Sequence, residues 1–218
     1  MKLSLASLSL LTLCLMLTAV PAVAQTVYNN GPIDGNTDAW TINFGFVQSD
    51  NFTVTGGNST ITGFSFGAWL FPGDILTSAE LSITSGENGG TTYFDQILNF
   101  TQGTCSYPNQ YGYNICQENS SFRGPTLNSG TYWVNLQNAV VPSGDPVYWD
   151  QNEGPSLASN NSVGTMPSEA FTVLGTGSST TSSSTSTTST GTVPEPSSIM
   201  LFGSGILGLA GMLRRKLW

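Results

Sequence analysis

Short runs in which large apolar residues alternate with polar ones dominate residues 25–174, and no stretch there has a convincing helical period. The alternation is clearest in residues 64–66 and 132–136, as expected for strands with one buried face. Gly, Asn, Asp, Ser and Pro separate the runs and favour turns between them. The predicted strands are Trp40–Val47, Asn51–Thr55, Ile61–Trp69, Ala79–Thr84, Thr92–Phe100, Thr131–Asn138, Pro146–Trp149 and Ala170–Leu174.

About eight short strands in roughly 150 residues favour an all-β fold, an antiparallel β-sandwich of jelly-roll type, with a barrel as the main alternative. Residues 25–175 form the predicted domain, called the ectodomain below, and they are long enough to bury one core. Most aromatic residues of the strand-like runs are expected in that core: Phe64, Phe66, Trp69, Trp133, Trp149 and Phe171.

The first 24 residues have the pattern of a signal peptide. Lys2 precedes an uncharged, Leu-rich run over residues 3–20, and Ala22 and Ala24 then form the small-x-small pattern that signal peptidase recognises. We therefore expect export through the Sec translocon and cleavage after Ala24. An uncleaved anchor is the alternative, while a lipoprotein at Cys14 is disfavoured because a bulky Leu13 precedes the cysteine.

The composition changes after the ectodomain. Residues 176–192 consist almost entirely of Ser, Thr and Gly, which predicts a flexible linker, either plain or O-glycosylated. The uncharged run over residues 198–213 is, at about 15–17 apolar residues, near the lower limit for a single transmembrane helix. It lies between Val193, Pro194, Glu195 and Pro196 on one side and Arg214, Arg215 and Lys216 on the other. The basic cluster is expected to keep the C-terminus in the cytoplasm and the ectodomain outside.

This order of Pro-Glu-Pro motif, apolar run and basic cluster over residues 193–218 resembles the PEP-CTERM sorting signal of Gram-negative bacteria. The resemblance implies recognition by an exosortase, transient residence in the inner membrane, processing of the tail and delivery to the cell surface or the extracellular matrix. A permanent membrane anchor is the alternative. A glycolipid-anchor signal is disfavoured because Arg214, Arg215 and Lys216 interrupt the hydrophobic end.

The ectodomain is also similar to a β-sandwich that recurs among PEP-CTERM proteins. No activity is established for that ectodomain, so the resemblance implies no catalytic residues. The stretches that carry it are Ile61–Phe66, Gly130–Trp133, Val147–Asp150 and Ser168–Gly175.

Charge narrows the range of partners. All thirteen acidic residues but only one basic residue, Arg123, fall in the exported portion, which gives that portion a net charge of about −12. Such a surface repels nucleic acids and anionic lipid headgroups. Divalent cations and neutral sugars, including extracellular polysaccharide, remain open as ligands.

The residue types also exclude several catalytic chemistries. The chain has no His, and the ectodomain has no Lys, so a nucleophilic serine would lack its usual base and most transition metals would lack imidazole ligands. A glycoside hydrolase based on two carboxylates stays open, although no pair is marked by the sequence. The protein is therefore predicted not to be an enzyme.

Two segments carry candidate sites. Cys105 and Cys116 are expected to form a disulfide after export. The loop between them contains Tyr107, Tyr111 and Tyr113, which either stack on a sugar or pack down to stabilise the loop.

The second segment is the turn that contains Asp34, Asn36 and Asp38, whose alternate oxygen side chains would suit a structural Ca²⁺. An ordinary turn is the alternative, and no other cofactor is predicted. Asp145 and Asp150 are expected to be loop carboxylates.

The sequence as a whole predicts an exported, surface-sorted, non-enzymatic protein with a structural or adhesive role in the envelope or biofilm matrix. A carbohydrate-binding module with structural calcium is the first alternative, and the carboxylate-based hydrolase is the second.

Overall fold

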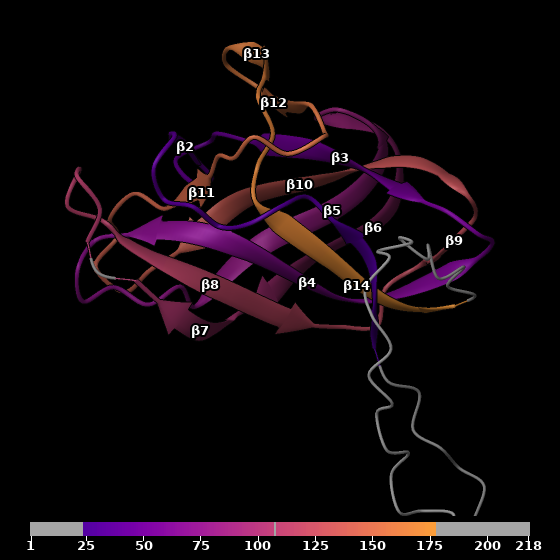
Figure 1. The fold of residues 1–218 in the computed structure, drawn as a ribbon, viewed down its shortest axis with the longest axis horizontal. Helices are drawn as coiled ribbons and strands as arrows, with labels where there is room; N and C mark the ends of the chain where they lie inside the picture. Colours follow the sequence, from indigo (N-terminus) through magenta and orange to yellow (C-terminus); the bar gives the residue numbers. More distant parts are fainter. Residues whose placement is uncertain (1–23, 107, 178–218) are drawn as a thin grey trace, which may run out of the picture. The chain divides into compact units, whose positions relative to one another are not determined.

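The computed structural model describes residues 24–106 and 108–177, which all belong to one compact unit (Figure 1). This part of the chain contains fourteen strands and no helix, and all strand pairs are antiparallel. The all-β prediction is therefore confirmed for the described residues.

The first sheet is centred on β4 (Ser59–Leu70), the longest strand. On one side of β4 lie β14 (Phe171–Gly177), followed by β1 (Gln25–Asn29), and the short strands β11 (Tyr148–Asp150) and β2 (Ala39–Thr41). On the other side lie β8 (Asn114–Ser121), followed by β7 (Thr101–Cys105), and the two-residue β9 (Thr126–Leu127).

The second sheet has the order β13-β12-β3-β10-β5-β6. Its long strands are β3 (Gln48–Val54), β10 (Gly130–Val140), β5 (Ser78–Gly86) and β6 (Gly89–Asn99). The short strands β12 (Ala158–Asn160) and β13 (Gly164–Met166) extend it beyond β3 as a hairpin. Figure 1 shows β14, β4, β8 and β7 side by side in front of β10, β5 and β6.

One hydrophobic core joins the two sheets. Phe66, Trp149 and Phe171 of the first sheet belong to the same buried cluster as Phe52 and Leu136 of the second. The ring of Tyr28 also contacts that of Phe52 across the sheets, with centroids 6.3 Å apart. Two separate sheets with a shared core make a sandwich-like fold and not a single closed barrel.

Four of the predicted aromatic core residues belong to the buried cluster between the sheets: Phe64, Phe66, Trp149 and Phe171. Trp69 is buried as well, but it is not part of that cluster. The prediction is wrong for Trp133, which is only half-buried. It precedes Val134, which belongs to the core, and successive side chains of a strand point to opposite faces. Trp133 therefore lies on the outer face of the second sheet.

The predicted strand Trp40–Val47 is wrong beyond Thr41. After β2 the chain turns, with the amide of Phe46 donating to the carbonyl of Asn43 at 3.1 Å. Phe44 and Gly45 adopt the left-handed conformation, with φ of 57° and 86°. A left-handed pair ends a strand, so the apolar residues of this segment form a turn.

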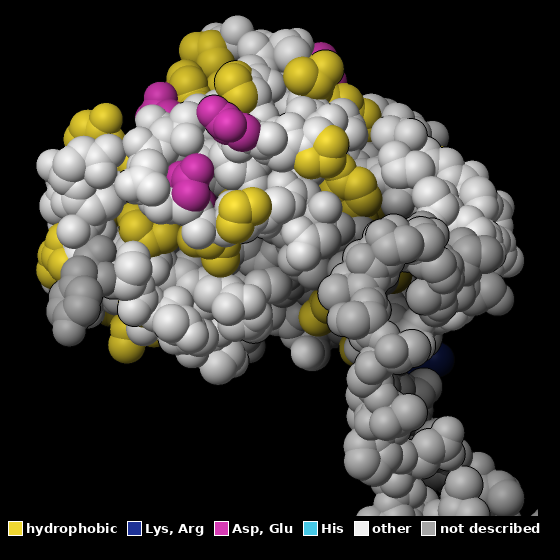
Figure 2. Space-filling view, in the orientation of Figure 1, with side chains coloured by type: hydrophobic (Ala, Val, Ile, Leu, Met, Phe, Trp, Pro, Cys, Tyr) yellow, Lys and Arg dark blue, Asp and Glu magenta, His cyan; other side chains and the backbone are white. Residues whose placement is uncertain are grey.

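The surface in Figure 2 carries hydrophobic and acidic side chains scattered over mainly uncharged polar groups. Within residues 24–106 and 108–177, no helix is long and apolar enough to cross a membrane. The predicted linker beyond Gly177, the transmembrane segment 198–213, the sorting and basic residues, and Ala22 of the cleavage pattern all lie outside the described residues.

Candidate functional site

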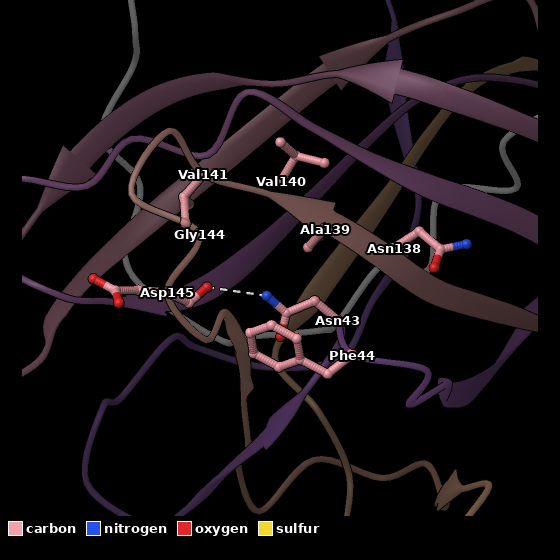
Figure 3. Close-up of a pocket in the computed structure, with 8 residues that line it drawn as sticks. All are labelled: Asn43, Phe44, Asn138, Ala139, Val140, Val141, Gly144 and Asp145. Carbon is pink, nitrogen blue, oxygen red and sulfur yellow. Dashed lines mark hydrogen bonds between the residues drawn. The ribbon is translucent and has the colours of Figure 1, made fainter.

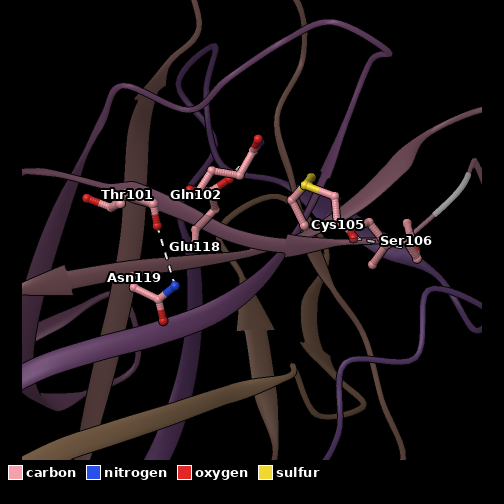
Figure 4. The surroundings of a disulfide bond; sticks show 8 residues. Thr101, Gln102, Cys105, Ser106, Glu118 and Asn119 are labelled. Carbon is pink, nitrogen blue, oxygen red and sulfur yellow. Dashed lines mark hydrogen bonds between the residues drawn. A yellow bond between two sulfur atoms is a disulfide. The ribbon is translucent and has the colours of Figure 1, made fainter.

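A disulfide closes the tyrosine loop, as predicted. Cys105 and Cys116 are bonded, and they are directly opposite each other on β7 and β8 (Figure 4). Within the loop, the Asn109 side-chain oxygen accepts hydrogen bonds from the backbone amides of Tyr111 and Tyr113 at 3.0 and 3.1 Å. The bridge fixes the two ends of the loop, and Asn109 orders its tip.

The loop tyrosines join aromatic residues of the first sheet. Tyr111 stacks on Trp69, with ring centroids 5.7 Å apart, while Tyr113 packs edge-on against Phe71 at 4.8 Å and Tyr148 at 5.3 Å. Tyr111 remains 60% exposed. The tyrosines thus stabilise the loop and still present ring surface to solvent. We call Trp69, Phe71, Tyr111, Tyr113 and Tyr148 the aromatic cluster; Tyr107 lies outside the described residues.

Strand pairing explains why the aromatic cluster forms. Trp69 of β4 is the register partner of Tyr148 of β11, so both side chains lie on the outer face of the first sheet. Burial raises the pKa of Tyr148 to about 12, and the Tyr113 hydroxyl contributes a smaller part of this increase. The phenol of Tyr148 therefore stays neutral. The pair has no local signal in the sequence, because Trp69 and Tyr148 are far apart in the chain and only the sheet brings them together.

The carboxylates of the predicted calcium turn accept hydrogen bonds from backbone amides of the same turn. Asp34 Oδ1 accepts the backbone amide of Asn36 at 2.8 Å, and Asp38 Oδ1 accepts that of Ala39 at 2.8 Å. The first contact is that of an ordinary Asx turn, and the second joins adjacent residues. In the described part of the chain, no group of three or more His, Cys, Asp or Glu residues is placed to hold a metal ion. Calcium at this turn stays a prediction.

The structure brings the two predicted segments together. The Asn109 amide nitrogen donates to the carbonyl of Gly35 at 3.0 Å, and the Gln110 amide nitrogen donates to the carbonyl of Asn36 at 3.1 Å. The disulfide loop and the Asp34–Asp38 turn therefore form one continuous surface at one end of the first sheet.

Asp150 anchors this surface and is not the loop carboxylate that we predicted. It belongs to β11 and is fully buried. Its Oδ1 accepts the Trp69 indole at 2.6 Å and the Gly35 amide at 3.0 Å, and its Oδ2 accepts the Asp34 amide at 2.9 Å. Burial raises the pKa of Asp150 to about 6, because these donors offset only part of the lost hydration. Asp145, by contrast, lies in the connection before β11, as expected.

A cavity of about 340 Å³ adjoins the aromatic cluster through Tyr148. Its lining, given below, combines aromatic rings, hydroxyl groups and one carboxylate, which together suit the apolar faces and hydroxyl groups of a neutral sugar. The cavity is lined by Asp38, Ala39, Trp40, Thr41, Phe46, Tyr148 and Ser162.

A second hollow, of about 360 Å³, lies beside the turn after β2 (Figure 3). Phe44 is 64% exposed at its rim, and the Asn43 side-chain amide donates to the carbonyl of Asp145 at 3.0 Å. The remaining lining is mainly apolar and comes from the end of β10 and the loop after it: Asn138, Ala139, Val140, Val141 and Gly144. Each of these two cavities therefore has a single carboxylate in its lining.

Comparison with known proteins bears on the C-terminal segment. Residues 192–216 match a family model described as the PEP-CTERM protein-sorting motif. No curated protein matches the chain. The match includes Val193, Pro194, Glu195 and Pro196 together with Arg214, Arg215 and Lys216. It confirms that the C-terminal segment resembles the PEP-CTERM sorting signal. The motif implies processing by exosortase and transit through the membrane to the surface or exterior. This chain is therefore a protein that carries the PEP-CTERM sorting motif.

Proposed function

We propose that this protein is exported, processed by exosortase and then active without catalysis, through adhesion or assembly, in the envelope or the biofilm matrix. The observation that carries the proposal is the sorting motif at residues 192–216, which follows an acidic, disulfide-bonded sandwich. In this proposal residues 1–24 are a cleaved signal peptide, residues 25–175 a jelly-roll ectodomain and residues 176–192 a linker. Residues 193–218 hold the ectodomain at the inner membrane, with their end in the cytoplasm, until processing.

The arrangement of the carboxylates supports a role without catalysis. Two-carboxylate glycoside hydrolysis requires two acids that face each other across the substrate. Asp38 and Asp145 line different cavities, one in each. Asp50 and Glu169, which do influence each other electrostatically, are fully buried and line neither of these cavities.

The sorting step is tested with Glu195→Ala in the full chain. We expect most of the wild type to lose its tail and leave the membrane fraction. Glu195 is the charged residue at the centre of the motif, so its replacement should block this processing. The variant should keep its tail and remain in the membrane. Mass spectrometry of the intact protein from each cell fraction measures both. Glu153→Ala, which removes an exposed acid of the ectodomain, is the matched control and should behave as wild type. An intact tail in the membrane fraction for all three proteins would instead mean a permanent anchor.

Sugar binding is a second candidate function. It is favoured by the aromatic cluster together with the adjoining cavity of about 340 Å³, which Trp40 and Tyr148 help to line. A sugar face would stack on the accessible part of Tyr111, while Asp38 and Ser162 supply hydrogen-bonding groups nearby. The partner in this proposal is an extracellular polysaccharide, whose neutral units are not repelled by the acidic surface.

Tyr111→Ala should weaken binding to a glycan, identified on an array, by about 0.5–1.5 kcal/mol, because one stacking contact is lost. Titration calorimetry with the full chain measures the change. Tyr93→Ala is the matched control, since Tyr93 is 44% exposed but belongs to β6 of the other sheet. The absence of any bound glycan, or an equal loss in both variants, would refute sugar binding at this surface.

A further inference from the structure

The turn after β2 contributes to both cavities. Thr41 and Phe46 line the cavity of about 340 Å³, which we call the Tyr148 cavity. Asn43 and Phe44, from the same turn, line the hollow of about 360 Å³, which we call the Phe44 hollow. Thr41 Oγ1 donates to Asn43 Oδ1 at 2.8 Å, so a hydrogen bond joins the two linings. Thr41 and Phe44 are three residues apart, so their Cα atoms are separated by at most about 11 Å. The Tyr148 cavity and the Phe44 hollow are therefore neighbours.

Side-chain amides hold this turn on two sides. On one side, Asn43 Nδ2 donates to the carbonyl oxygen of Asp145 at 3.0 Å. On the other side, Asn161 Nδ2 donates to the carbonyl oxygen of Gly45 at 3.1 Å, and Asn161 Oδ1 accepts the backbone amide of Val47 at 3.0 Å. The backbone between these contacts is thus tied to the connection before β11 and to the turn between β12 and β13.

Two strained backbone positions line the Phe44 hollow. Three non-glycine residues have a positive φ in residues 24–106 and 108–177, and two of them, Phe44 at 57° and Asn138 at 51°, belong to this lining. A positive φ is uncommon for a bulky residue such as phenylalanine. The ring of Phe44 is 64% exposed, so burial of the ring does not offset the strain. Strained positions of this kind gather at ligand-binding sites, where they fix a side chain in the position that the ligand requires.

A β-bulge shapes another wall of the Phe44 hollow. The register of β10 against β5 shifts between Gln137 and Val140. Leu136 faces the core, so plain alternation along β10 would also bury Val140. The shift instead buries Ala139 and Val141 and leaves Val140 50% exposed. Bulges are frequent next to binding sites, because they redirect side chains in this way.

The groups around the Phe44 hollow suit one unit of a neutral sugar. The exposed ring of Phe44 offers a flat apolar surface on which the apolar face of a pyranose can stack. Figure 3 shows the side chains of Asn138 and Asp145 on opposite sides of Ala139. Asn138 Nδ2 donates to Glu80 Oε2 at 2.8 Å, which orients its amide, and the half-buried Asp145 supplies a carboxylate. Amide and carboxylate oxygens accept hydrogen bonds from hydroxyl groups, and a few such groups in an apolar pocket orient a ligand.

We propose that the Phe44 hollow is a second sugar subsite, so that it and the Tyr148 cavity bind different units of one neutral polysaccharide chain. This inference rests on the sugar binding proposed for the aromatic cluster. A polymer is the ligand class that fits, because a single sugar unit can occupy only one of the two cavities. The acidic surface, with about −12 charges on the exported portion, disfavours anionic chains. The second subsite adds affinity only for a chain that is long enough to cross the turn after β2.

The test is titration calorimetry of the full chain with the glycan identified on the array and with its hydrolysis fragments, sorted by length. Phe44→Gly removes the ring, and glycine accepts a positive φ without strain, so this variant should fold. Fragments too short to cross the turn should bind Phe44→Gly and the wild type equally. Longer fragments should bind the variant about two- to tenfold more weakly, because one stacked ring is lost. Phe44→Trp, which keeps an aromatic face, should retain the affinity of the wild type.

Tyr93→Ala on β6 is the matched control and should bind fragments of every length as the wild type does. If Phe44→Gly also binds all fragments like the wild type while Tyr111→Ala weakens them, the second subsite is refuted and sugar binding at the aromatic cluster stands. An equal loss in Phe44→Gly and Tyr93→Ala would likewise refute the second subsite. If the wild type binds no glycan, sugar binding fails at both cavities.

Discussion

Raising the pH from 4 to 8 in EDTA is expected to lower the free energy of unfolding of the full chain by several kcal/mol. Burial raises the pKa of Asp50 and of Glu118 to about 7 and that of Asp150 to about 6. The folded state therefore holds protons that the unfolded state, with carboxyl pKa values near 4, releases. The stability that these groups contribute is fully present below about pH 4 and is lost as the pH rises through about 7.

Asp50 alone accounts for a decrease on the order of 4 kcal/mol, since a pKa difference of one corresponds to about 1.4 kcal/mol. The ionisable groups that face it are Glu169, on the segment before β14, and Tyr28, on β1. Neither carries a positive charge, so in the described surroundings of Asp50 its ionised form is favoured by hydrogen bonds alone, from Ser156, from the Asn30 side-chain amide and from the backbone.

Urea unfolding at several pH values, followed by tryptophan fluorescence, measures this dependence. Asp50→Asn should flatten the curve, because the amide does not titrate. The control is Glu87→Gln, at an exposed residue between β5 and β6 that shifts the pKa of none of these carboxyls, and it should keep the wild-type curve. A stability that rises between pH 4 and pH 8 would contradict the prediction. The result does not depend on calcium, because EDTA is present throughout.

Trp149→Ala is expected to cost about 3–5 kcal/mol of folding free energy. Trp149 is fully buried and packs edge-on against Phe64, Phe66 and Phe171, with ring centroids 5.6–5.9 Å apart. Its indole nitrogen also donates to the carbonyl of Ala170 at 3.0 Å. The substitution leaves a cavity at the centre of the core, and domains of this size are stable by only about 5–15 kcal/mol.

Urea unfolding at fixed pH measures the loss, with Trp133→Ala as the matched control. Trp133 lies half-buried on the outer face of the second sheet, so its removal should cost about 1 kcal/mol. Trp149→Phe keeps most of the packing and loses only the indole donor, so its cost should fall between the two. Similar costs for both alanine variants would contradict the central place of Trp149 in the core.

The parts of the fold that the sequence predicted are those with a local signal. Strands β4, β5, β6 and β10 contain clear runs of β-branched or aromatic residues, so the alternation alone located them. Strand β8 was missed because its buried face carries Cys116, Glu118 and Ser120, two of which are polar. A strand with a polar buried face has no hydrophobic period to detect.

The site was predictable only in its separate pieces. The even pair of cysteines after a signal peptide indicated the disulfide. The contact between Asn109 and Gly35 joins residues 74 positions apart, and such contacts follow from the sheet arrangement and not from local composition. Asp150 was misassigned because aspartate is rare in buried strands; here three hydrogen-bond donors from distant segments permit it.

The bridge between Cys105 and Cys116 sets the order of events during maturation. Thiols stay reduced in the cytoplasm, so the loop that carries Tyr111 and Tyr113 has no covalent closure there. Oxidation after export fixes the loop ends on β7 and β8 and allows Tyr111 and Tyr113 to settle on Trp69 and Phe71. The covalent closure that holds the loop tyrosines beside Trp69 and Phe71 is therefore complete only in an oxidising compartment.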